Sequence, residues 1–414
     1  MYNRILRNPD FLKIWIAQLT SQLASNLLNF ALIIRVYELA ANTRFANVAV
    51  SLLILAFGIP SIIFAVLAGA YVDHWDRKKV LIVTNIARAV LVLGFLIFSS
   101  NLLMIYLIVF AVSVFSQFFT PAEGAALPKL VDKSDLVSAN SLFLFTLYGS
   151  FVVGYSLAGP IISLWGSDAV YWVTAASFVL ASVLCITLPS LRAKLEPKDL
   201  SQVNKEVFTT IHHNFAKIIK NPNLILPIAN LTIAQAMLGV IAVLAPAIAI
   251  LIFNQSLAAV SYKIVVPAAL GMVLGAILVG MVFKRTSKTK LINIGIGVAA
   301  IMLIGLSFVP VLSNLRFFGA LVAIISLTLG ISNGFVSVSA QTLLQLNSTD
   351  ETRGKIFGTL NMMMNVAAII PVFLAGVTAD LVSPLSVLTI SGVLIGLYGI
   401  FQYRLFARLR LKST

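Results

Sequence analysis

Long apolar runs dominate the chain, and they limit the folds open to it more than any other feature. Each run has about 20 residues, the length of helix that crosses the hydrocarbon of a bilayer. Hydrophobic residues make up 60% of the 414 residues and charged residues 10%, whereas soluble domains carry roughly 45–50% and about 25%. In lipid only helices and closed barrels satisfy their own backbone, and barrel strands would give short alternating segments. The sequence therefore predicts an all-α polytopic membrane protein.

Twelve apolar runs predict twelve transmembrane helices. They cover residues 11–38, 46–72, 80–99, 102–120, 138–164, 168–188, 223–253, 258–283, 290–311, 315–341, 355–380 and 384–406. The longest polar interval, Pro189–Asn221, divides the runs six and six. We therefore expect an N-terminal six-helix bundle (1–188), a cytoplasmic linker (189–221) and a C-terminal six-helix bundle with a basic tail (222–414).

Short motifs recur in the two halves, which indicates two six-helix pseudo-repeats. The segment Gly69-x-x-x-Asp73 has a counterpart in Gly280-x-x-x-Lys284, each followed by basic residues. Likewise Leu157-Ala158-Gly159 recurs as Leu374-Ala375-Gly376. Duplicated halves with a substrate site between them are an architecture of membrane transporters.

The distribution of positive charge predicts the topology. If the N-terminus is cytoplasmic, all but five of the 29 Lys and Arg residues fall in or beside cytoplasmic segments, the exceptions being Arg35, Arg44, Arg88, Lys263 and Arg316. The positive-inside rule then places both termini in the cytoplasm of a multi-pass protein of the inner or plasma membrane. The net charge of +15 is spread over alternate loops, which argues against a nucleic-acid-binding patch.

The polar residues outside the spans give no indication of an enzyme. The second half of the linker has apolar residues at helical spacing, which predicts an amphipathic helix at the membrane interface: Val207, Ile211, Phe215, Ile218 and Ile219. Adjacent His212 and His213 would point about 100° apart on a helix, so no shared metal is expected. Neither a phosphate-binding loop nor a Cys/His cluster occurs. We expect no cofactor, and Cys185, inside an apolar run, is expected to be a packing residue.

A charged segment between the second and third runs carries the most specific motif. Residues 69–81 read Gly-Ala-Tyr-Val-Asp-His-Trp-Asp-Arg-Lys-Lys-Val-Leu. This resembles the loop Gly-x-x-x-Asp-Arg-x-Gly-Arg-Lys of major facilitator superfamily transporters, with matches at Gly69, Asp73, Arg77 and Lys78. The acidic variant, with Asp76 in place of Gly, is similar to the branch of macrolide efflux proteins and enterobactin exporters.

The resemblance implies a role for this segment as a cytoplasmic latch. In the family the loop holds the two halves together through the start of the eleventh helix, whose counterpart here is near Arg353–Phe357. A carboxylate at Asp73 would gain from a neighbouring helix N-terminus and from a nearby Arg. The alternative is an ordinary basic loop that only fixes topology.

A second segment extends the resemblance to the same exporter branch. Residues 119–128 read Phe-Thr-Pro-Ala-Glu-Gly-Ala-Ala-Leu-Pro and are followed by Ala-Asn at 139–140. Pro121 and Pro128 are expected to end the helix, because proline removes a backbone donor. Glu123 stands where the branch has Arg. It is one candidate partner for Arg88, whose charge inside the third span needs one.

Another charge pair is expected between Arg35 and Glu38, whose i,i+3 spacing suits an ion pair. The sequence leaves open whether Glu38 or Glu123 titrates during transport.

Four amides form a stripe in the first span. Gln18, Gln22, Asn26 and Asn29 lie within roughly 80° of one helix face, and they must face protein or water rather than lipid. They predict a wall of a substrate cavity, and helix–helix packing is the alternative. The resemblance implies that the first and seventh helices line the cavity, and the seventh span contributes Asn230 and Gln235. The eleventh span adds Asn361 and Asn365, and helix–helix packing is the alternative for all four residues.

Together the motifs imply a secondary active transporter. We expect export of a small amphiphilic molecule, drug- or siderophore-like, by alternating access with proton antiport, from a monomer in the lipid bilayer. Two alternatives remain at this point. One is a lysophospholipid transporter or flippase of a related branch, and the other is a non-transporting scaffold or receptor on the same fold.

Overall fold

The fold is entirely helical wherever the structure describes it. The computed structural model describes residues 2–132, 135–192, 221–253, 261–312, 317–346 and 350–411. Over these ranges no strand occurs, and twelve helices are long and apolar enough to cross a membrane. The predicted fold class is confirmed. The predicted amphipathic helix at 207–219, with His212 and His213, lies outside the described residues.

The chain forms two compact units. The first comprises Met1–Leu39, Leu52–Phe215 and Asn361–Val366, and the second comprises Ala40–Ser51, Ala216–Leu360 and Ala367–Thr414. Two long helices, α3 (Ala46–Val72) and α14 (Asp350–Leu381), contribute residues to both units. The predicted division into bundles at residues 189–221 stays a prediction.

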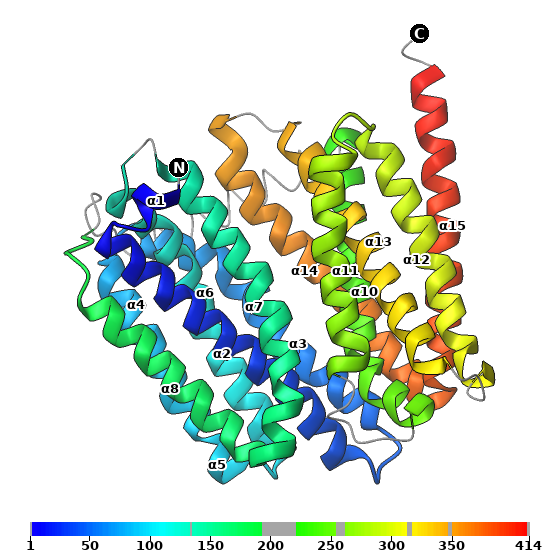
Figure 1. Cartoon of the computed structure of the whole chain (residues 1–414), viewed down its shortest axis with the longest axis horizontal. Helices are drawn as coiled ribbons and strands as arrows, with labels where there is room; N and C mark the ends of the chain where they lie inside the picture. Colours follow the sequence, from blue (N-terminus) through cyan, green and yellow to red (C-terminus); the bar gives the residue numbers. More distant parts are fainter. Residues whose placement is uncertain are drawn as a thin grey trace. The chain divides into compact units, whose positions relative to one another are not determined.

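The first unit contains most of α3 together with the helices before it and those from α4 to α8 (Figure 1). Its helices are α1 (Tyr2–Ile5), α2 (Pro9–Ala40), α4 (Arg77–Leu93), α5 (Phe95–Phe98), α6 (Leu102–Leu130), α7 (Leu136–Trp165) and α8 (Ser167–Ile186). Within it α4 packs against α6 and α8. Asp76 starts α4, because its Oδ1 accepts the backbone N–H of Lys78 at 3.0 Å. Asn101 starts α6 in the same way through the N–H of Met104 at 3.2 Å. Such side-chain acceptors satisfy donors that have no partner inside a helix.

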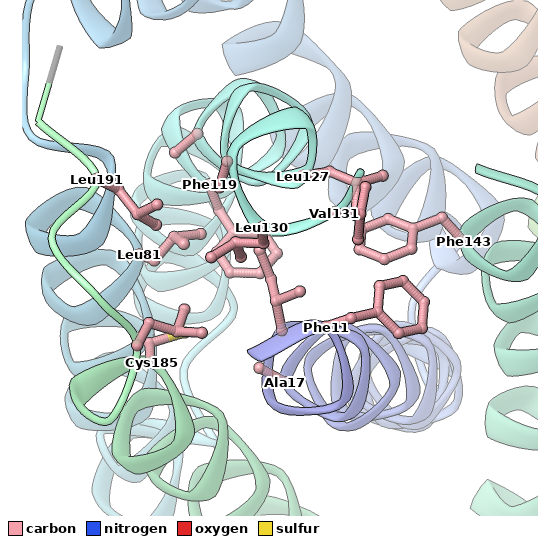
Figure 2. Packing of buried hydrophobic residues seen from close by; sticks show 14 of the residues in the cluster. Phe11, Ala17, Leu81, Phe119, Leu127, Leu130, Val131, Phe143, Cys185 and Leu191 are labelled. Atoms are coloured by element: carbon pink, nitrogen blue, oxygen red, sulfur yellow. The ribbon is translucent and has the colours of Figure 1, made fainter. Parts of the chain in front are cut away.

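One end of the first unit is held by a cluster of buried apolar side chains from α2, α4, α6, α7 and α8 (Figure 2). The rings of Phe11 on α2 and Phe143 on α7 have centroids 6.2 Å apart. Cys185 on α8 is fully buried in this cluster. The prediction that Cys185 is a packing residue is therefore confirmed.

The prediction that Pro121 and Pro128 end the fourth span at about residue 120 is wrong. Helix α6 continues through both prolines to Leu130. The turns beyond Pro121 bury Ala126 and Leu127 in the cluster of Figure 2, and this burial offsets the backbone donors that the prolines lack. Prolines inside membrane helices are tolerated where neighbouring groups stabilise the turn.

The second unit contains α10 (Pro222–Phe253), α11 (Val266–Ile277), α12 (Lys288–Phe308), α13 (Phe318–Leu346) and α15 (Pro384–Leu411). Turns of π-helix precede and follow α11, at Ser261–Val265 and Leu278–Val282, and a 3₁₀ turn, Val309–Leu312, follows α12. In this unit α13 packs against α10, α11 and α12, and α12 also packs against α15 (Figure 1).

Glycines allow α11 and α13 to approach closely. A Cβ atom on Gly271 of α11 would overlap the backbone oxygen of Leu327, and one on Gly330 of α13 would overlap that of Ala268. Each helix repeats the pattern after four residues, with Gly275 on α11 and Gly334 on α13. Small residues at this spacing let two membrane helices bring their backbones together.

Candidate substrate cavity and helix-capping carboxylate

The first unit contains a cavity of about 230 Å³ between α2, α3, α4 and α6. Its lining combines hydroxyl, amide and aromatic groups with one cation: Ser21, Gln22, Ser25, Leu28, Asn29, Phe57, Arg88, Val112, Ser113, Ser116, Phe119 and Thr120. The contributions of α2 and α6 recur at helical spacing, so one face of each helix supplies them. The cavity thus has a polar wall and an apolar wall.

Some amides of the predicted stripe on α2 line the cavity, and another packs against a neighbouring helix. Gln22 and Asn29 line the cavity. Asn26 instead donates a hydrogen bond from Nδ2 to the Oγ of Ser150 on α7, at 3.3 Å. Gln18 is buried, and its Oε1 accepts no hydrogen bond from the described residues.

The other predicted cavity residues do not line this cavity. Asn230 on α10 is buried and accepts a hydrogen bond from the hydroxyl of Tyr398 at 3.2 Å. Asn365 on α14 donates to the Oγ of Ser61 at 3.1 Å. Gln235 is exposed, and the side chain of Asn361 lies outside the described residues. Their predicted role in substrate binding stays a prediction.

Arg88 of α4 is the cation of the cavity and is only 2% exposed. Its Nε donates to the backbone oxygen of Thr84 at 3.2 Å and its Nη2 to the Oδ1 of Asn85 at 2.7 Å. The guanidinium lies 4.5 Å from the ring centroids of both Phe119 and Phe178. Two cation–π contacts and two hydrogen bonds compensate for the lost hydration of the charge. These groups hold Arg88 in place at the cavity wall.

Glu123 and Arg88, the predicted charge pair, make no direct contact. The described residues contain no ion pair between them within 4.0 Å. Glu123 is 5% exposed, and its Oε1 has no hydrogen-bond partner in the described part of the chain. Arg88 therefore keeps its hydrogen bonds on its own helix.

The predicted pair Arg35 and Glu38 lies on α2. The Nη1 of Arg35 is 4.0 Å from the Oε2 of Glu38, and its Nε donates to the backbone oxygen of Ser99 at 3.0 Å. Both side chains are partly exposed. Arg35 thus connects α2 to the turn between α5 and α6.

The predicted latch segment has an exposed carboxylate and a buried cation. Asp73 is exposed, and among the described residues its carboxylate accepts no hydrogen bond and forms no ion pair, whereas neighbouring Asp76 caps α4. Arg77 is 9% exposed, and its Nε and Nη1 have no hydrogen-bond partner there. Lys78 donates from Nζ to the backbone oxygen of Leu188 at 2.6 Å.

The latch itself stays a prediction. At Gly69 no atom lies within 4 Å of the position of a Cβ. The side chains of 353–357, the expected partners of the loop, lie outside the described residues.

A capping site that the sequence did not reveal lies in the second unit. Asp380, at the end of α14, accepts hydrogen bonds at Oδ1 from the backbone N–H of Asn47 at 3.1 Å and from its Nδ2 at 2.7 Å. Its Oδ2 accepts the N–H of Val48 at 2.8 Å. A carboxylate at the first turn of α3 satisfies two free backbone donors and interacts favourably with the helix dipole.

Close packing between α3 and α14 continues from this cap. The Oγ of Ser51 donates to the backbone oxygen of Val372 at 3.3 Å. A Cβ on Gly376 would overlap the Oγ of Ser51, so only glycine allows this approach. Because Asn47 and Asp380 are 333 residues apart, no local sequence pattern could have indicated the pair.

In the described part of the chain, twelve helices are long and apolar enough to cross a membrane, and a partly polar cavity lies among α2, α3, α4 and α6. These features define a polytopic membrane protein of the transporter class. The model of the Major Facilitator Superfamily matches residues 14–372, and the chain belongs to this family. It is accordingly a transporter rather than an enzyme, and the predicted family is confirmed.

Relatives cover nearly the full chain. It is 26% identical over 393 residues to macrolide efflux protein A of Streptococcus pyogenes, covering 93% of each chain. It is 24% identical over 413 residues to the enterobactin exporter EntS of Citrobacter koseri, covering 97% of this chain and 93% of the relative. Among solved structures, the nucleoside transporter NupG (D323A mutant) matches with a TM-score of 0.76 at 13% identity, over 95% of this chain and 99% of that one. The likeness to NupG shows the fold alone.

Proposed function

We propose that this transporter is a secondary active exporter of a small amphiphilic molecule that works by alternating access with proton antiport. The observation that carries the proposal is the cavity of the first unit, whose lining is both polar and apolar. Pockets that bind small molecules combine an apolar surface with a few placed polar groups. An amphiphilic cargo matches both kinds of wall.

The relatives support the direction and the chemical class of the cargo. One similar protein carries the name macrolide efflux protein A and another the name enterobactin exporter. Both names refer to export of small molecules. We place the protein in a cell (inner or plasma) membrane as a monomer with cytoplasmic termini, because the basic residues concentrate in alternate loops.

The proton carrier proposed for antiport is one of two acids. Glu123 on α6 is buried, and Glu38 on α2 is partly exposed beside Arg35. An intramembrane carboxyl that changes its access to water can carry a proton. The variants Glu38→Gln and Glu123→Gln remove one titrating group each, and the carrier is the residue whose variant transports without dependence on a pH gradient.

Reconstituted proteoliposomes test the proposal. Flux of a macrolide, a catecholate siderophore and a lysophospholipid is followed with an acidic lumen, with equal pH on both sides, and in protein-free vesicles. We expect a pH gradient to accelerate uptake of the macrolide or the siderophore.

Three results would contradict the proposal in different ways. Flux that ignores the gradient would exclude antiport. Lysophospholipid flux alone would favour lipid transport between leaflets. No flux of any of the three would favour a non-transporting scaffold or receptor.

A further inference from the structure

We propose that Arg88 and the cavity of the first unit form a subsite for the carboxylate end of a small aromatic monoanion. The proposal rests on the proposed export function for its biological meaning, and it specifies the chemical class of the cargo. The binding chemistry itself depends only on the residues that line the cavity.

The first observation is the hydrogen-bonding capacity that Arg88 retains. Guanidinium has five N–H donors in a planar fork. The bonds to Thr84 and Asn85 occupy Nε and one donor of Nη2, and Cζ lies over the rings of Phe119 and Phe178. Nη1 makes no hydrogen bond to the residues that the structure describes. A buried cation with unused donors at a cavity wall is suited to bind an acceptor that carries negative charge.

The second observation is the state of the hydroxyl groups around the cavity. Four of them donate their only proton to a backbone oxygen: Ser25 to Ser21 at 2.9 Å, Ser113 to Phe57 at 2.7 Å, Ser116 to Val112 at 2.9 Å and Thr120 to Ser116 at 3.3 Å. Their oxygens can then only accept hydrogen bonds from a ligand. The ligand therefore needs a donor, such as a hydroxyl group, at a distance from its carboxylate.

The third observation is the size of the cavity and its apolar wall. Leu28, Phe57, Val112 and Phe119 supply aliphatic and aromatic surface. The volume of about 230 Å³ is below the roughly 300–1,000 Å³ of sites for drug-sized ligands. One substituted ring fits such a cavity, whereas a whole macrocycle does not. A larger cargo would place only its anionic end there.

The single cation of the cavity limits the charge of the ligand. Among the residues that line the cavity, Arg88 alone carries a charge. A dianion would bring two negative charges close together against one guanidinium. Like charges at short distance repel more strongly in a medium of low dielectric constant than in water. A monoanion is therefore the favoured class.

Binding to the full-length protein in lipid nanodiscs tests this subsite with a matched pair of probes. The pair is 4-hydroxybenzoate and 4-hydroxybenzamide, which share ring, shape and hydroxyl donor but differ in charge. Isothermal titration calorimetry at neutral pH should give an affinity for the benzoate at least about tenfold higher, as a charge-assisted hydrogen bond predicts.

Variants assign the preference to Arg88. We expect Arg88→Gln to abolish it, and Arg44→Gln, which removes an exposed charge outside the cavity, to leave it unchanged. Arg88→Lys keeps a positive charge at the cavity wall, so it should still bind the benzoate more tightly than the benzamide. This second variant tests the subsite even if Arg88→Gln fails to fold, which size-exclusion chromatography would reveal.

The outcomes separate this inference from the proposed function. Equal affinity for the two probes, or an equal loss in Arg88→Gln and Arg44→Gln, overturns the subsite. Equal affinity for the two probes in a folded Arg88→Lys variant also overturns it. If a cargo is transported in proteoliposomes but the carboxylate probe is not preferred, the export function is supported and the subsite is refuted. A clear preference without flux of any cargo would uphold the subsite and refute export.

Discussion

Asp380 binds Asn47 through a single carboxylate oxygen, which accepts both the backbone N–H at 3.1 Å and the side-chain amide at 2.7 Å. The pair joins the end of α14 to the start of α3 within the second unit. Each of these helices also has residues in the first unit. Three hydrogen bonds to one side chain thus hold the first turn of α3.

Replacing Asp380 with Asn should loosen the first turn of α3. An amide nitrogen then faces one of the donors that the carboxylate satisfies, and loss of such a cap costs about 0.5–2 kcal/mol. We expect faster hydrogen exchange over Ala46–Val50. The control Asp168→Asn changes an exposed acid in the first turn of α8 and should leave this exchange unchanged. Wild-type exchange in Asp380→Asn would refute the capping role.

Adding one methyl group at Gly330 should destabilise the second unit. The new Cβ would overlap the backbone oxygen of Ala268, and overpacking of this kind costs about 1–3 kcal/mol. We expect Gly330→Ala to lower the thermal unfolding temperature in detergent. Gly305→Ala on α12 is the matched control, because no atom lies within 4 Å of its Cβ position. Similar unfolding temperatures for the two variants would show that α11 and α13 are not tightly packed there.

The amides of α2 should respond differently to the same substitution. Gln22 lines the cavity, whereas Asn26 bonds to Ser150. We expect Gln22→Leu to change the KM or the choice of cargo with little effect on thermal unfolding. Asn26→Leu should lower the unfolding temperature, because an interhelical hydrogen bond is worth about 1–2 kcal/mol or less. If both variants transport as wild type does, the stripe serves packing alone.

Substitutions can also distinguish the roles of two acids in the segment between α3 and α4. Asp73 has no described partner and Asp76 caps α4. The predicted latch would hold the cytoplasmic side closed, and Asp73→Asn would weaken it. We therefore expect this variant to raise the labelling rate of a cysteine introduced on the cytoplasmic side and to leave the free energy of unfolding unchanged. Asp76→Ala should lose about 0.5–2 kcal/mol of unfolding free energy. Unaltered labelling in Asp73→Asn would count against the latch.

The sequence was sufficient for the fold and the family because both depend on features that are local along the chain. Apolar runs long enough to cross a bilayer identify membrane helices one at a time. The motif with Gly69 and Asp73 lies within one loop, and it led to the family that the comparison confirms. The spacing of Gln22 and Asn29 on one helix face likewise placed them toward protein, and both line the cavity.

Features that depend on contacts between residues far apart in the sequence could not be predicted. The cap at Asn47 requires Asp380 from another helix, and nothing near either residue indicates the pairing. Pro121 was expected to end its helix, because the burial that sustains α6 beyond it comes from other helices. The four-residue spacing of the glycines in α11 and α13 is visible in the sequence and is typical of close helix packing. The sequence alone does not show which two helices pack together.

The contacts of Arg88 with two rings have a consequence for the entropy of binding. A free arginine side chain has many rotamers, and ordering it on a ligand costs about 0.5–1.5 kcal/mol. The guanidinium of Arg88 contacts the rings of Phe119 and Phe178 and donates hydrogen bonds to Thr84 and Asn85, so it is already ordered when the protein has folded. A ligand that reaches Nη1 thus meets a preorganised group, so its affinity is not reduced by the cost of ordering a flexible side chain.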